Sequence, residues 1–213
     1  MKRILFCICF TACLFSCSDD ASTTPEIQED NFYALTVGNF WVYKNYRYNH
    51  QTEVYDDTGV IDSVSIVATE DISGNTYFKF RRLTTGNEEG ITFCNANGEH
   101  FEYLRETNGN LVTSEGDVKF TNNDFSVRVL SENNWGNIVE QLAEGESTLD
   151  VEAGTFTCIN SQRYAILPDG NNSPAVDYFY YADGFGLIYD TSSFVSSDIP
   201  SVIRRLDSYS IAE

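Results

Sequence analysis

The chain has 213 residues, with 13 lysines and arginines against 32 aspartates and glutamates, which gives a formal net charge of −19 at pH 7. A surface this acidic repels a phosphate backbone, so the composition argues against nucleic acid as a partner. Hydrophobic residues make up 42% of the chain and aromatic residues 14%, which is enough for a hydrophobic core and too much for a chain that is disordered throughout.

The first residues have the pattern of a lipoprotein signal peptide. Two of the first three residues are basic, and residues 4–15 form an apolar stretch. That stretch is shorter than the roughly 20 residues that a membrane-spanning helix needs. The sequence Leu14-Phe15-Ser16-Cys17 that follows resembles the lipobox of bacterial lipoproteins. The resemblance implies that residues 1–16 are removed and that Cys17 becomes an acylated N-terminus carrying palmitate; an ordinary secretory signal is the alternative.

The residues after Cys17 indicate where the protein is delivered. Ser18-Asp19-Asp20 resembles the acidic export signals that send lipoproteins of Bacteroidetes to the outer face of the outer membrane. Several acyl chains anchor a protein stably, whereas one chain does not. We therefore expect a lipid-anchored outer-membrane protein, exposed at the cell surface or else facing the periplasm. Residues 17–31 are polar and acidic and are expected to form a flexible tether.

From Phe32 onward apolar and aromatic residues recur without a second linker, which predicts a single domain over residues 32–213. Turn signals rich in Gly, Asn and Asp are spaced by 8–15 residues, without helical periodicity between them. This pattern predicts an all-β domain of mostly antiparallel meander strands. Residues 56–59 are expected to be one of the turns, and residues 137–144 fit a short helix or a strand equally well. The expected strands are 40–48, 60–69, 76–83, 91–94, 100–105, 155–167, 178–181, 186–189 and 202–211.

Several expected strands are apolar on both faces. Trp41 and Tyr43 share one face of the strand 40–48, whose other face is also apolar, and all four residues of 178–181 are aromatic. Such strands must be covered on both sides, by the sheet curling onto itself or by a second sheet. We expect a strongly curved, half-barrel or barrel-like sheet, with a two-sheet β-sandwich as the alternative. The rings either pack with their hydroxyls in water or line a groove for an apolar or sugar ligand; the candidates for the groove are Trp41, Tyr43, Phe179 and Tyr181.

Three short stretches resemble motifs of uncharacterised lipoproteins of Gram-negative bacteria, particularly Bacteroidetes. They are VGNFWVY at residues 37–43, EAGTF at residues 152–156 and GFGLI at residues 184–188. The resemblance implies a fold similar to the curved antiparallel sheets of outer-membrane lipoprotein carriers, which hold acyl chains in a half-barrel. A shared fold implies little about function.

The sequence contains none of the familiar catalytic or phosphate-binding motifs. Of its two histidines, His100 has Glu102 on the same face of an expected strand, which is fewer ligands than a metal site needs. Residues 169–173 are rich in oxygen ligands but lack the glycine and the final acidic residue of a calcium loop, so they predict a turn. We expect no metal, no cofactor, no catalytic residues and no enzymatic activity.

Two cysteines follow Cys17 once the signal peptide is removed, Cys94 and Cys158. An exported protein permits a disulfide between them. The alternative is two separate thiols that pack as small hydrophobic side chains.

Together these features predict a membrane-anchored lipoprotein whose β-domain is not an enzyme and acts by binding or as an envelope component. Its expected partners are the membrane, through the acyl chains, and an envelope protein, a glycan or an apolar ligand. One alternative is a carrier of an apolar ligand or lipid in the half-barrel, which requires a deep apolar cavity. The other is a surface hydrolase, which requires two carboxylates that face each other in a cleft.

Overall fold

The computed structural model describes residues 31–212; residues 1–30 and 213, and with them the predicted signal peptide and Cys17, lie outside the described residues. None of the described residues belongs to a helix long and apolar enough to cross a membrane. The described chain forms thirteen strands. In chain order they are β1 (Phe40–Asn49), β2 (Val54–Ile72), β3 (Asn75–Thr85), β4 (Gly98–Thr107), β5 (Asn110–Thr113), β6 (Val118–Thr121), β7 (Arg128–Asn133), β8 (Gly136–Leu142), β9 (Ser147–Val151), β10 (Gly154–Ile166), β11 (Asn172–Ala182), β12 (Gly186–Ser192) and β13 (Val202–Ser210).

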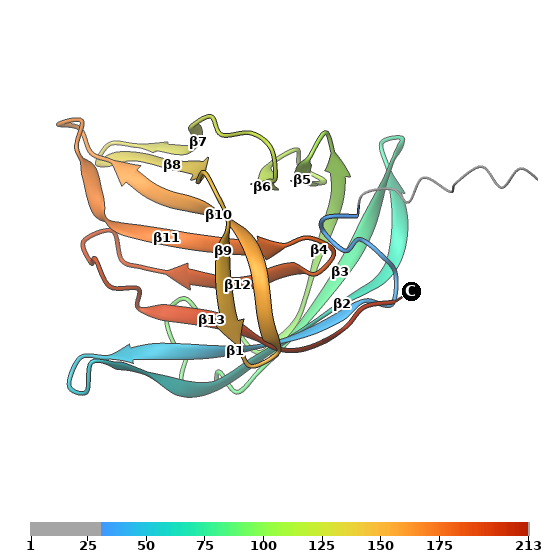
Figure 1. Cartoon of the computed structure of the whole chain (residues 1–213), viewed down its shortest axis with the longest axis horizontal. Coiled ribbons are helices and arrows are strands. Elements are labelled where there is room, and N and C mark those ends of the chain that lie inside the picture. The colour runs from blue at the N-terminus through green and yellow to red at the C-terminus, as the bar shows by residue number, and fades with distance from the viewer. Residues whose placement is uncertain (1–30, 213) are drawn as a thin grey trace, which may run out of the picture. The chain divides into compact units, whose positions relative to one another are not determined.

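All strands belong to one antiparallel sheet. Its order is β6-β5-β4-β3-β2-β1-β13-β12-β11-β10-β8-β7, and β9 pairs with the first part of β10. In Figure 1 the sheet bends round until β5 and β6, at one edge, lie along the same rim as β7 and β8 at the other. The strongly curved sheet expected from the sequence is therefore confirmed, and the two-sheet sandwich is wrong.

The sheet remains open between its two edge strands. Within residues 31–212 no backbone pairing joins β6 to β7. A side chain spans the gap instead: Nη1 of Arg128 on β7 donates a hydrogen bond of 3.3 Å to the carbonyl oxygen of Val118 on β6. The same guanidinium forms an ion pair of 2.5 Å with Glu140 on β8, whose side chain is 1% exposed. The ion pair fixes Arg128 within its own edge, and the hydrogen bond to Val118 links that edge to β6 where a ladder would close a barrel.

Bulges contribute to the curvature of the sheet. The register of β1 shifts between Val42 and Tyr43 against β13, and between Lys44 and Tyr46 against β2. An extra residue on one strand bends that strand and increases its twist. Residues 56–59 lie at the second of these shifts, inside the 19-residue strand β2. The turn predicted there is wrong, because Gly59 adopts its positive φ in a bulge and not in a hairpin turn.

The structure differs from the predicted strands in other places for two reasons. In one place side-chain hydrogen bonds replace backbone strand pairing, and in others the strands are short. Residues 91–94, expected as a strand, form a loop, because the Asn87 side chain accepts from the amide of Ile91 at 2.7 Å and donates to the carbonyl of Asn95 at 2.8 Å. Residues 137–144 are mostly strand β8, not helix. The sequence did not predict β5, β6, β7 or β9, which have four to six residues and little alternation.

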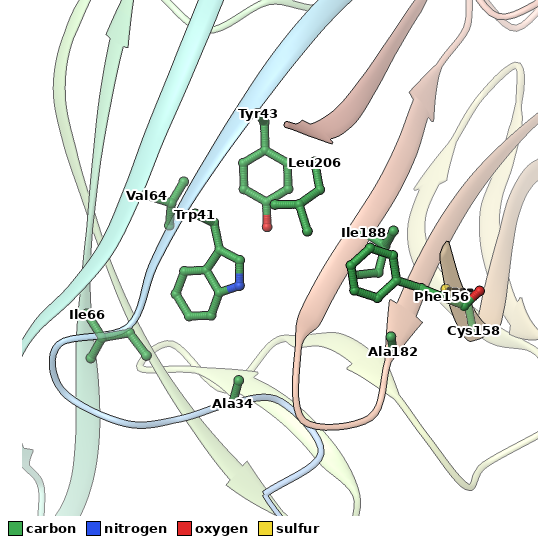
Figure 2. Close-up of a cluster of buried hydrophobic side chains, with 10 residues drawn as sticks. All are labelled: Ala34, Trp41, Tyr43, Val64, Ile66, Phe156, Cys158, Ala182, Ile188 and Leu206. Atoms are coloured by element: carbon green, nitrogen blue, oxygen red, sulfur yellow. Dashed lines mark hydrogen bonds between the residues drawn. The ribbon is translucent and has the colours of Figure 1, made fainter. Parts of the chain in front are cut away.

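The buried side chains form two clusters inside the curve. The first lies where β1 and β2 face β10, β12 and β13 (Figure 2). In it the indole of Trp41 donates to the carbonyl oxygen of Phe185 at 2.8 Å, and the hydroxyl of Tyr43 donates to that of Leu187 at 2.9 Å. Large aromatic rings are thereby buried without unsatisfied polar atoms. The first cluster contains Ala34, Trp41, Tyr43, Val64, Ile66, Phe156, Cys158, Ala182, Ile188 and Leu206, and the second Phe32, Tyr33, Leu104, Leu111, Phe120 and Leu142.

The segment before β1 packs into the second cluster. Phe32 and Tyr33 contact Phe120 of β6, at ring-centroid distances of 6.5 and 6.2 Å, and Tyr33 also contacts Tyr181 of β11 at 6.0 Å. The hydroxyl of Tyr33 donates to the carbonyl oxygen of Gly109 at 2.6 Å. Residues 31–213 form one compact unit that contains every strand and both clusters. A unit with its own hydrophobic core has what it needs to fold alone.

Candidate functional site

The concave face of the sheet surrounds a cavity of about 310 Å³. Volumes of roughly 300–1,000 Å³ are typical of small-molecule pockets. Successive residues of a strand point to opposite faces, so residues two apart share the concave face. Trp41 and Tyr43 of β1 line the cavity, as do Phe179 and Tyr181 of β11. The structure therefore brings together all four aromatic residues that the sequence singled out, from strands that are far apart in the chain.

The aromatic and aliphatic side chains of the lining together form what we call the aromatic wall of the cavity. The ring of Phe80 on β3 stacks on Trp41 at 6.3 Å, and Tyr181 stacks on Phe120 at 4.0 Å. The ring of Tyr181 is partly buried, and desolvation of its hydroxyl raises the pKa of that group. A neutral phenol and stacked rings offer a surface for an apolar group. The apolar and aromatic residues of the lining are Tyr33, Trp41, Tyr43, Val64, Phe80, Phe93, Leu104, Leu111, Phe179, Tyr181, Leu187 and Val202.

A charged network around Arg204 of β13 adjoins the aromatic wall. Its guanidinium binds Asp190 of β12 through two hydrogen bonds of 2.9 and 2.5 Å, and it lies 3.6 Å from Asp62 of β2. Its carbon Cζ lies 5.2 Å from the ring centre of Tyr43. Although burial disfavours its charge, Asp190 and Asp62 raise the pKa of Arg204. Arg204 is thus a fixed and fully neutralised cation.

Asp62 is a fully buried carboxylate at the base of this network. It accepts hydrogen bonds from Thr84 at 2.5 Å, from Asn45 at 3.2 Å and from Asn95 at 3.3 Å. Burial alone would raise the pKa of Asp62, but Arg204 and the hydrogen bonds lower it below its usual value. The carboxylate therefore stays ionised, and it holds in place Asn45 and Asn95, which line the cavity, and the buried Thr84, which does not.

Arg82 of β3 lines the same cavity without a partner of its own. Its Nε is buried and has no hydrogen-bond acceptor. Among residues 31–212 it forms no ion pair, although Asp62, Glu102 and Asp190 attract it from a distance. Burial, followed by the like charge of Arg204, lowers the pKa of Arg82. Its donors are consequently available to a group inside the cavity.

The two other cations of the lining are already paired. Lys119 of β6 lies 2.6 Å from Glu102 of β4, and Arg163 of β10 lies 2.8 Å from Glu140. A second hollow of about 360 Å³ opens beside the first. The two hollows share five lining residues and are therefore adjoining parts of one space. The shared residues are Val64, Phe80, Arg82, Glu102 and Lys119.

The β3–β4 loop contributes Phe93 to the cavity lining. Phe93 has a φ of 71°, which is unusual for a bulky residue, and its ring packs against Phe194 at 4.8 Å. The next residue, Cys94, is a free thiol, and so is Cys158 in the first core cluster. The disulfide proposed from the sequence is not formed, because one thiol lies in this loop and the other is packed inside β10. Burial raises the pKa of both thiols to about 11.

The polar side chains that the sequence analysis considered as metal ligands or catalytic residues do not form a joint site in the structure. Across residues 31–212 there is no group of three or more His, Cys, Asp or Glu side chains that could hold a metal ion. His100 contacts the carbonyl oxygen of Ala96 at 2.8 Å, while Glu102 binds Lys119. Residues 169–171 form a turn in which Asp169 accepts from the amide of Asn171 at 3.0 Å. The two carboxylates of the cavity lining, Glu102 and Asp190, each bind a basic side chain.

Sequence reasoning missed the roles of polar residues of the cavity lining, among them Arg82, Asp190 and Arg204, and of the buried Asp62 behind them. One signal was present for Arg82: it lies two residues after Phe80, so both share a face of β3, whereas its neighbour Arg81 faces the other way and pairs with Glu99. To tell that Arg82 lies in the cavity and Arg81 on the surface, one must also know which face of β3 is the concave one, and the sequence does not say this.

Two solved structures are similar to this chain. A candidate exported protein with a YmcC-like fold from Bacteroides fragilis matches with a TM-score of 0.51 and 11% identity, over 85% of this chain and 99% of that chain. A candidate lipoprotein from Parabacteroides distasonis matches with a TM-score of 0.44 and 13% identity, again over 85% and 99%. No protein-family model matches the sequence, and no curated protein is detectably similar to it. The likeness to the first structure shows a shared fold; it does not extend to function.

Proposed function

We propose that this chain is an exported lipoprotein, anchored in the outer membrane through acylated Cys17, whose β-domain binds a small ligand with a substantial apolar part inside its curved sheet. Export is supported by the lipobox-like sequence and by a shared fold with a candidate exported protein. Surface display is supported by the acidic residues after Cys17.

The observation that carries the binding function is the composition of the cavity. Stacked aromatic rings, with Leu104 and Leu111, line a space of about 310 Å³ that lies within the fold of a single chain. Removing such a surface from water is favourable, because it lowers the free energy by about 25 cal/mol per Å² of apolar area. Burying the apolar body of a ligand of matching size lowers the free energy in the same way. The cavity therefore favours a function as a carrier or binding protein.

The carboxylates of the cavity favour binding over catalysis. An acid–base pair for hydrolysis needs two carboxyl groups whose environments separate their pKa values. Here Asp190 is held in two hydrogen bonds by Arg204, and Glu102 is held by Lys119. These groups fix the shape of the cavity, and we propose that they have no catalytic role.

Binding in the cavity is tested with N-phenyl-1-naphthylamine, an uncharged apolar fluorophore whose emission rises in an apolar site. The domain of residues 31–213 should bind it saturably. Phe179→Ala removes a ring from the cavity wall and should weaken binding several-fold. Tyr178→Ala is the matched control, because Tyr178 is the preceding residue of β11 and stacks on Tyr180 on the other face.

The two variants separate the cavity from other apolar surfaces. Equal weakening by Phe179→Ala and Tyr178→Ala would place the fluorophore outside the cavity. Absence of saturable binding to the unmodified domain would contradict the proposed function.

A further inference from the structure

We propose that the natural ligand carries one carboxylate, which binds to Arg82, while its apolar body lies against the aromatic wall of the cavity. This inference rests on the proposed function, since it specifies the chemistry of the molecule bound in that cavity. It assigns Arg82 as the residue that selects for charge.

The first step of the argument is the state of Arg82. A charge that is taken out of water without a partner is costly, and proteins usually pair it or let it bind a ligand. The guanidinium of Arg82 is partly buried, its Nε lacks an acceptor, and no carboxylate of residues 31–212 forms an ion pair with it. Both burial and the nearby charge of Arg204 disfavour its protonated form. An anion beside it would relieve both effects.

The second step is that the other cations of the lining are already occupied. Arg204 binds Asp190 and lies beside Asp62, Arg163 binds Glu140, and Lys119 binds Glu102. One cation without a partner matches a ligand with one negative charge. A second charge on the ligand would have to compete with a carboxylate that the protein supplies. A guanidinium also fits a carboxylate in a planar, two-point arrangement.

The third step is the position of Arg82 relative to the apolar wall. Arg82 borders both hollows, and so does Phe80, which stacks on Trp41 in the larger aromatic surface. A carboxylate at Arg82 therefore lies next to rings on which an alkyl or aromatic body can pack. Phe179, Tyr181 and Leu111 line the same cavity and add to its apolar surface. The arrangement fits an amphiphile with its head at Arg82.

The test compares decanoate with 1-decanol, which has the same chain length and no charge. The chain has two tryptophans, Trp41 in the cavity wall and Trp135, which is 45% exposed in the β7–β8 turn. Trp135→Phe leaves Trp41 as the only fluorescent indole, so a change in emission reports on the cavity. In this background the domain of residues 31–213 should bind decanoate at least about tenfold more tightly than 1-decanol, because charge-assisted hydrogen bonds are strong.

Arg82→Gln should remove this preference and leave the affinity for 1-decanol nearly unchanged. Arg81→Gln is the matched control: it makes the same change one residue away, on the outer face, where Arg81 pairs with Glu99. It should keep the preference. Circular dichroism and thermal unfolding of each variant show whether the fold is retained, and Arg82→Lys provides a second variant that keeps the charge and should keep part of the preference.

The outcomes separate this inference from the proposed function. If neither decanoate nor 1-decanol changes Trp41 emission and the naphthylamine also fails to bind, binding in the cavity is contradicted. If both bind with equal affinity, or if Arg82→Gln and Arg81→Gln have the same effect, the cavity binds apolar ligands without selection by Arg82, and this inference is overturned.

Discussion

Asp62 shows how one buried carboxylate can organise a site. Its side chain is fully buried, yet it accepts hydrogen bonds from three side chains and lies near the Arg204 guanidinium. Removing one partner from such a network leaves the others buried and unsatisfied, which costs more than the network contributed in net terms. The network therefore couples the shape of the cavity wall to the stability of the fold.

We predict that Asp62→Asn lowers the free energy of unfolding by about 2–4 kcal/mol at pH 7. The pKa of Asp62 is lowered in the folded protein, so its contribution is fully present above the usual carboxyl pKa of about 3.9. It is lost as the pH falls through the lower folded value. Urea denaturation should thus show a difference between wild type and variant that shrinks in acid. Asp71→Asn, at an exposed position of the same strand, should cost well under half as much at neutral pH; equal costs would contradict the role of burial.

We predict from the sequence alone that acylated Cys17 attaches the chain to a membrane. Mass spectrometry of the protein purified from its own cells should show a chain that begins at a diacylated or triacylated Cys17. Cys17→Ser should abolish acylation and shift the mature domain from the membrane to the soluble or uncleaved form. A membrane-bound product that still begins with Met1 would contradict the prediction.

At the scale of elements, the close approach of β2 and β3 depends on two glycines. Gly59 lies in the bulge of β2, and Gly86 directly follows β3 with a φ of 85°. A Cβ at Gly86 would collide with the carbonyl oxygen and carbon of Gly59. Because the colliding atoms belong to the backbone, a side chain cannot be accommodated by a rotamer change. The strand end and the bulge must therefore move apart if residue 86 is larger than glycine.

We predict that Gly86→Ala destabilises the protein by more than Gly74→Ala. Gly74, in the β2–β3 turn, has a similar φ of 80° but open space around its Cβ position. Both variants bear the strain of positive φ, about 1–2 kcal/mol, and only Gly86→Ala bears the collision. Thermal unfolding of both variants measures the difference. Identical midpoints would show that the backbone contact with Gly59 has no energetic weight.

For the domain as a whole, the curvature of one sheet creates both the core and the cavity. The first cluster fills the space between β1 and the β10–β13 side, and the second fills the space near β6 and the segment before β1. The cavity lies between strands from both halves of the sheet. Since all of these parts lie within residues 31–213, the domain does not need the preceding residues for its core.

We predict that residues 31–213, produced alone, fold cooperatively. All strands of residues 31–212 share one sheet and the core that it encloses, which favours unfolding in one transition. Circular dichroism should show a β-sheet spectrum and a single thermal transition, and near-ultraviolet dichroism should show ordered aromatic side chains. Removing residues 31–35 as well should be strongly destabilising, because Phe32 and Tyr33 are buried in the second cluster. Equal stability of the two chains would contradict a structural role for that segment.

Much of the fold was predictable because its signals are local. Turn residues and strand-forming runs predicted antiparallel β-structure, and strands β1, β3, β4 and β10 to β13 lie close to their expected positions. Aromatic residues on both faces of residues 40–48 predicted that both faces are covered. The structure buries the face of Trp41 and Tyr43, but Phe40 on the other face is 37% exposed, because a single curved sheet covers only its concave side. Strands β5, β6, β7 and β9 were not predicted because they are short and show little alternation, although each of them pairs with a strand that is next to it in sequence.

The sequence by itself determined the fold class and the aromatic character of Trp41, Tyr43, Phe179 and Tyr181, and it alone predicts the address at Cys17, since each depends on residue types within a few positions. Only the tertiary structure decided that these rings share one cavity, that Cys94 and Cys158 are apart, and that Arg82 lacks a partner. The physical reason is that alternation along a strand defines two faces but does not say which is concave. Curvature, bulges and pairings between distant strands make that choice, and they place a cation without a partner among apolar rings.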